Sequence, residues 1–210
     1  MSELKASDWN TVVVGKWNPA ILSPKGISTL LFNKDATEPI EVMVSLEQMG
    51  PTKVRIDGIG VTVDYDRLII DAAEQKWESL AKTREYACRA IATLERTPLS
   101  AAGFNVRYEL KDYPESFITL LKPPLDDVIS DNNQEILERE TRRSLKWKEG
   151  SINLQISRKE ETYSIILNFD RTSDDCEKLK NWLSIPIGEV REITATIISS
   201  ILQLCEKGEI

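Results

Sequence analysis

The chain has 210 residues, of which 27 are Lys or Arg and 34 are Asp or Glu, so its net charge is −7. Hydrophobic residues make up 41%, which is the composition of a folded domain and excludes a disordered or collagen-like chain. The sequence contains no histidine. That absence excludes Ser-His-Asp and Cys-His catalysis, histidine metal ligands and imidazole pH switching.

The first half is predicted to contain five strands, one short helix and one long helix. The strands are expected at residues 11–17, 40–46, 53–56, 60–64 and 67–71. Residues 40–46 alternate apolar and polar side chains, which is the pattern of a half-buried strand. Asp57-Gly58 predicts a hairpin turn. The short helix is expected at 26–32, after Ser23-Pro24, and the long amphipathic helix at 75–96.

A loop of small residues is expected at 99–102, and the second half, which starts at Gly103, then repeats a similar order. Its expected elements are a strand at 103–110, short helices at 114–121 and 125–129, strands around 142–148, 152–156 and 165–169, a helix up to residue 183 and a terminal helix up to Gly208. The Glu-rich stretch 135–141, which precedes the first strand of this meander, is equally compatible with a helix. The cluster at 172–175 predicts a helix start.

Both halves, 1–102 and 103–210, therefore run strand, short helix, meander and long helix. Two such β-α-β-β-β-α units can pair into one compact α+β protein, with an antiparallel sheet and two long helices on one face. This arrangement resembles the TATA-binding-protein-like and helix-grip folds. The likeness is architectural, no sequence motif carries it, and it implies no function. The alternative is a single sheet whose halves match by chance.

The predicted cellular compartment rests mostly on segments and patterns that the sequence lacks. The polar residues 1–10 do not form a signal peptide, and no apolar stretch is long enough to cross a bilayer. Cys88, Cys176 and Cys205 are spaced too widely for a disulfide framework or a zinc site, and Cys88 and Cys205 are expected to be buried. We expect a cytoplasmic protein of bacterial or viral origin, with no membrane contact.

The candidate chemistry is sparse. Gly58-Ile59-Gly60 lacks the following helix of a phosphate-binding loop. The acidic pairs are better explained as turn formers and helix caps than as catalytic carboxylates. These pairs are Asp64 with Asp66, Asp126 with Asp127, and Asp174 with Asp175. We therefore expect no catalytic residue, no metal and no cofactor.

The candidate interaction surface consists of a basic strand and one tryptophan. Its residues are Trp9, Arg142, Arg143, Lys146 and Lys148. Alternation along a strand places Arg142, Lys146 and Lys148 on one exposed face, with Trp147 toward the core. Such a strand suits an acidic protein, a phosphate or a nucleic acid, or it is a solvated edge strand whose lysines prevent pairing. Trp9 lies in a polar segment and is an interface candidate.

Three functions remain open. The leading hypothesis is a non-catalytic protein-interaction or self-associating accessory protein, whose partner is another protein or a second copy. The second is a nucleic-acid-binding protein that uses the sheet and the basic strand at 142–148, which the acidic balance disfavours. The third is a small-molecule binder or hydrolase with a pocket between the sheet and a long helix.

Overall fold

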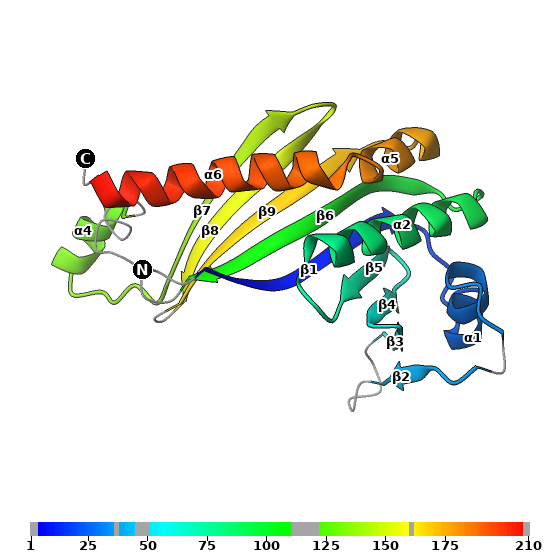
Figure 1. Ribbon diagram of the computed structural model, residues 1–210. Helices are drawn as coiled ribbons and strands as arrows, with labels where there is room; N and C mark the ends of the chain where they lie inside the picture. Colours follow the sequence, from blue (N-terminus) through cyan, green and yellow to red (C-terminus); the bar gives the residue numbers. More distant parts are fainter. Residues whose placement is uncertain (1–3, 36–37, 45–50, 111–121, 160–161, 208–210) are drawn as a thin grey trace.

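A nine-stranded antiparallel sheet carries the fold, in a computed structural model that describes residues 4–35, 38–44, 51–110, 122–159 and 162–207 (Figure 1). The strands are β1 (Leu4–Gly15), β2 (Glu41–Met43), β3 (Lys53–Ile56), β4 (Ile59–Val63), β5 (Arg67–Ala72), β6 (Leu99–Leu110), β7 (Glu138–Trp147), β8 (Gly150–Lys159) and β9 (Thr162–Thr172). Their order across the sheet is β2-β3-β4-β5-β1-β6-β9-β8-β7. The predicted α+β class with an antiparallel sheet is confirmed.

The helices that the structure describes are α1 (Pro24–Gly26), η1 (Ile27–Leu31), α2 (Trp77–Thr93), α4 (Leu125–Asp131), α5 (Cys176–Leu183) and α6 (Ile187–Lys207). The long helices α2 and α6, together with α5, lie over one face of this sheet (Figure 1). The two long helices, α2 and α6, are those expected from the sequence. Among the described helices, none is long and apolar enough to cross a bilayer.

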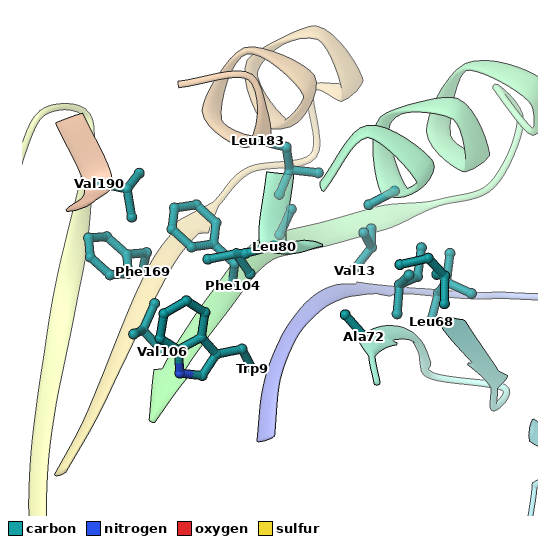
Figure 2. Packing of buried hydrophobic residues seen from close by; sticks show 14 of the residues in the cluster. Trp9, Val13, Leu68, Ala72, Leu80, Phe104, Val106, Phe169, Leu183 and Val190 are labelled. Carbon is teal, nitrogen blue, oxygen red and sulfur yellow. The ribbon is translucent and has the colours of Figure 1, made fainter. Parts of the chain in front are cut away.

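The core lies between the helices and the sheet (Figure 2). Successive side chains of a strand point to opposite faces, so every second residue of the central strands packs against a helix. Phe104 of β6 and Phe169 of β9 stack with their ring centroids 4.8 Å apart. Leu80 of α2, Leu183 of α5 and Val190 of α6 are buried in the same cluster. Apolar side chains from both halves thus form one core.

Local signals place several elements where they were predicted. Asp57 and Gly58 both have positive φ between β3 and β4, as a tight two-residue hairpin turn requires. The Asp175 carboxylate accepts hydrogen bonds from the backbone N–H of Glu177 and Lys178, at 2.9 and 3.2 Å. It is therefore the N-cap of α5.

Trp9 corrects the prediction of an exposed interface residue. β1 begins at Leu4, and only 3% of Trp9 is exposed. Asp8 has a φ of +49°, and the β1–β6 register shifts between Ser7 and Asn10. This bulge changes the alternation of the strand and turns the indole into the core, where its ring centroid lies 4.6 Å from that of Trp77. A pattern that assumes uniform alternation does not reveal such a shift.

Other boundaries also differ from the predictions. β2 is short and exposed rather than half-buried, because it lies at the edge of the sheet and, among the described strands, pairs with β3 alone. The expected loop at 99–102 is the start of β6, which pairs there with β1 and β9. The helical interpretation of 135–141 is wrong, since β7 begins at Glu138. The predicted helix at 114–121 and the stop at Gly208 lie outside the described residues.

Candidate interaction surface

The face of the sheet opposite the helices bears a row of asparagines at matching positions of four neighbouring strands. The asparagine row consists of Asn153 (β8), Asn168 (β9), Asn105 (β6) and Asn10 (β1), and the strand registers align them side by side. Each amide donates to the carboxamide oxygen of the next, with N–O distances of 3.0, 2.8 and 2.7 Å along the row. The hydrogen bonds hold the four side chains in one line.

The asparagine row keeps hydrogen-bonding capacity for a ligand. A carboxamide has two N–H donors and two oxygen lone pairs. Asn105 and Asn168 each use one N–H and one lone pair within the row. Among the described residues, each of these two amides therefore keeps one further N–H and one further oxygen lone pair beyond those used in the row.

The row lines an open hollow of about 560 Å³. Besides the four asparagines, its lining comprises Arg107, Arg142, Arg143, Ser144, Leu154, Gln155 and Ile166. The lining thus contains no carboxylate, and the side chains of two of its arginines, Arg107 and Arg142, lie on the open face. Arg143 borders the hollow, but it pairs with the buried Leu154, so its side chain lies on the helix face. Two carboxylates lie outside the lining: Asp8 is 3.3 Å from an Nη of Arg107, and Glu140 is paired with Arg142. The hollow is a cationic and amide-rich surface on an acidic protein.

The basic strand 142–148 forms one side of this hollow. Residues 142–147 of this strand lie in β7, which is an edge strand because, in the part of the chain that the structure describes, β8 is the one strand paired with it. Arg142, Arg143 and Lys146 are all exposed, and 72% of the Arg142 side chain is accessible. The structure therefore brings Arg142 together with Arg107, which the sequence did not associate with it, and turns the side chain of Arg143 to the other face of the strand.

Lys148 does not share the exposed face of the strand. β7 ends at Trp147, and Lys148 follows in the turn with a φ of +49°. Its ammonium group is paired with Glu189 at the start of α6. Trp147 faces the core as expected, with its ring centroid 5.2 Å from that of Phe169. The turn changes the direction of the chain, and alternation therefore stops before Lys148.

The asparagine row and Arg107 were missed from the sequence, although a signal existed. Asparagine is depleted in β-strands, yet one lies within each of β1, β6, β8 and β9. An unfavourable residue repeated in four strands indicates a shared role. The pairing of those strands, which brings the residues into one row, is non-local.

The acidic pairs serve local structure. Asp126 is buried and paired with Arg139 of β7, and Asp127 is paired with Lys122. The side-chain hydrogen bond from Arg67 lowers the pKa of Asp66. Across the described residues, no group of three acidic or cysteine side chains is arranged to hold a metal ion.

No known protein-family model matches this chain, and no curated protein matches it either. A functional proposal must therefore be based on the geometry of the open face.

Proposed function

We propose that this protein is a non-catalytic interaction module that binds an acidic segment of a partner protein on the open face of its sheet. The observation that supports this most directly is the composition of the hollow, which has no carboxylate in its lining, has Arg107 and Arg142 on the open face and is bordered by Arg143. Guanidinium groups form charge-assisted and often bidentate hydrogen bonds with carboxylates. The asparagine row adds donors and acceptors, which suit the amide groups of a polypeptide.

Nucleic acid is the second candidate, because phosphates also bind arginine. Two observations weigh against it. The net charge of −7 repels an extended polyanion at long range more strongly than a short acidic segment, which carries fewer charges. In addition, among the described residues that the registers place on the open face, none is aromatic. Single-stranded nucleic acids usually stack their bases on aromatic side chains.

A pocket beneath the helices has less support. Phe104, Leu80 and Leu183 pack against one another between the sheet and the helices (Figure 2). These apolar side chains occupy the space in which a helix-grip ligand would bind.

The test compares the wild-type chain with the triple variant Arg107→Gln, Arg142→Gln, Arg143→Gln. Binding of a fluorescent decapeptide of alternating Glu and Ser is followed by anisotropy, beside a Lys-Ser decapeptide and single-stranded and duplex oligonucleotides. We expect the wild type to bind the acidic decapeptide, the triple variant to lose binding, and affinity to fall as ionic strength rises. Lys16→Gln, Lys76→Gln, Arg96→Gln is the matched control, because it removes three exposed cations elsewhere.

A tagged pull-down from native extract, with and without nuclease, extends the test to natural partners. The proposal requires a protein that the wild type and the control retain, that the triple variant loses, and that survives nuclease. Partners that disappear with nuclease, or oligonucleotide binding stronger than peptide binding, would favour the nucleic-acid hypothesis instead. Equal retention by the triple variant would show that the hollow is not the binding site.

A further inference from the structure

The charges of edge strand β7 are divided along its length. Its side chains on the open face are acidic in the first half, at Glu138 and Glu140, and basic in the second half, at Arg142 and Lys146. An antiparallel copy of the same strand would place the acidic half of one against the basic half of the other. The strand is therefore electrostatically complementary to itself.

The backbone of the same residues is available for pairing. Trp147 and Gly150 close a two-residue hairpin between β7 and β8, and the closing pair of such a hairpin is hydrogen-bonded. Hydrogen-bonded and non-bonded pairs then alternate along the strand. The N–H and C=O groups of residues 138, 140, 142, 144 and 146 consequently point away from β8, toward the free edge.

We propose that two copies of this chain associate through β7, antiparallel about a two-fold axis at Thr141. In this register Glu140 of each copy lies opposite Arg142 of the other. If the register is extended by one residue, the exposed Leu137, which precedes β7, lies opposite the exposed Leu145 of the second copy. Arg139 of one copy lies opposite Arg143 of the other. The positive charge of Arg139 is balanced within its own chain by the buried carboxylate of Asp126.

Charge and backbone geometry select this register over its neighbours. A shift of the axis to Arg142 would put the two Arg142 side chains directly opposite each other, which is unfavourable. An axis between residues 141 and 142 would pair outward-pointing backbone groups with inward-pointing ones. The interface is isologous, as closed dimers require, and it extends the sheet from one copy into the other. Dimerisation through β7 does not require the acidic partner proposed above.

The test is a charge-swap experiment read by sedimentation velocity. The wild type is expected to dimerise in a concentration-dependent way. Glu140→Lys alone and Arg142→Glu alone place like charges opposite each other, so each should weaken dimerisation by about tenfold or more. An equimolar mixture of the two variants should form a heterodimer, because the introduced lysine of one copy then faces the introduced glutamate of the other. Glu140 and Arg142 also form an ion pair within one chain. Mixing the two variants cannot restore that pair within either chain, so a recovery of dimerisation in the mixture is due to the interface between the copies.

Ser144→Pro is the second variant. Proline is tolerated on an edge strand but removes an outward N–H, so the chain should fold and remain monomeric. Circular dichroism checks that each variant folds. A wild type that stays monomeric at the highest soluble concentration would overturn the proposal, as would a dimer unaffected by either charge change. Glu140 lies outside the lining of the hollow. A Glu140→Lys variant that is monomeric but still binds the acidic decapeptide would show that dimerisation and peptide binding are separate properties, so that each proposal can fail without the other.

Discussion

At the scale of single residues, the open face combines amides, cations and one unusual carboxyl group. Asp170 of β9 lies on this face, opposite Ser151 and Gly103 in the strand registers. Burial raises the pKa of Asp170, because partial removal from water disfavours the charged form. No ion pair of Asp170 is seen among the described residues. Its ionisation therefore weakens the folded state.

The first prediction concerns Asp170→Asn. The pKa of this carboxyl group is higher in the folded state than in the unfolded state, where it is about 3.9. The free energy of unfolding therefore decreases as the pH rises from the unfolded-state pKa to the folded-state pKa. Above the folded value the reduction stays constant. We expect Asp170→Asn to raise the free energy of unfolding at neutral pH, and the gain to vanish below about pH 4. Urea unfolding of the wild type and the variant, at neutral pH and below about pH 4, measures this difference in the free energy of unfolding.

The control for this prediction is Asp131→Asn, at an exposed position, which should change stability little at either pH. A gain from Asp170→Asn of equal size at both pH values would show that ionisation of the carboxyl group is not its cause.

At the scale of elements, one buried arginine connects α2 to the junction of α5 and α6. Only 3% of Arg84 is exposed. Its guanidinium donates to the carbonyl oxygen of Leu183 at 2.7 Å and to that of Ile185, and it lies 4.5 Å from the ring centroid of Phe104. Burial lowers the pKa of Arg84 to about 10, so it stays charged at neutral pH. It thereby satisfies carbonyls at the end of α5 that have no helical partner.

The second prediction is that Arg84→Met lowers the free energy of unfolding by about 2–4 kcal/mol. Methionine fills much of the volume but leaves two carbonyl groups without a donor. Arg84→Lys should lose less, since an ammonium group can serve one of them. Arg96→Met, at an exposed site just beyond α2, should change the value by no more than about 0.5 kcal/mol. Urea unfolding of the three variants distinguishes the lost hydrogen bonds from a general effect of losing an arginine.

At the scale of the whole molecule, the two halves share one sheet and one core. β1 and β6 join them along most of their lengths, and β6 also pairs with β9. The boundary expected between residues 102 and 103 falls inside β6. Separating the halves there would expose the backbone of β1 together with the apolar faces of Trp9 and Phe104.

The third prediction is that the chain unfolds in one cooperative transition. Tryptophan fluorescence samples both halves, through Trp9 and Trp77 in the first and Trp147 and Trp182 in the second. Its urea transition should coincide with that of far-ultraviolet circular dichroism. Two separated transitions would instead show that 1–102 and 103–210 are independent domains.

The features that depend on local interactions could be predicted from the sequence. The alternation of apolar residues indicated the strands around Ile165, and the helical spacing of apolar residues indicated α2 and α6. Asp57-Gly58 specified the turn between β3 and β4, and Asp175 specified the N-cap of α5. These signals act over a few residues, because pleat, helix period and capping are local geometry. The α+β class and the antiparallel sheet follow from them.

The open face of the sheet, the edge strands and the long-range residue contacts could not be predicted from the sequence, because they depend on how the strands pair. The bulge at Asp8 buries Trp9, and the pairing of four strands aligns Asn10, Asn105, Asn153 and Asn168. These outcomes depend on contacts between residues far apart in the chain, as in the 95 positions that separate Asn10 from Asn105. Local patterns carry no information on such pairings, and the candidate site was therefore only partly visible in the sequence.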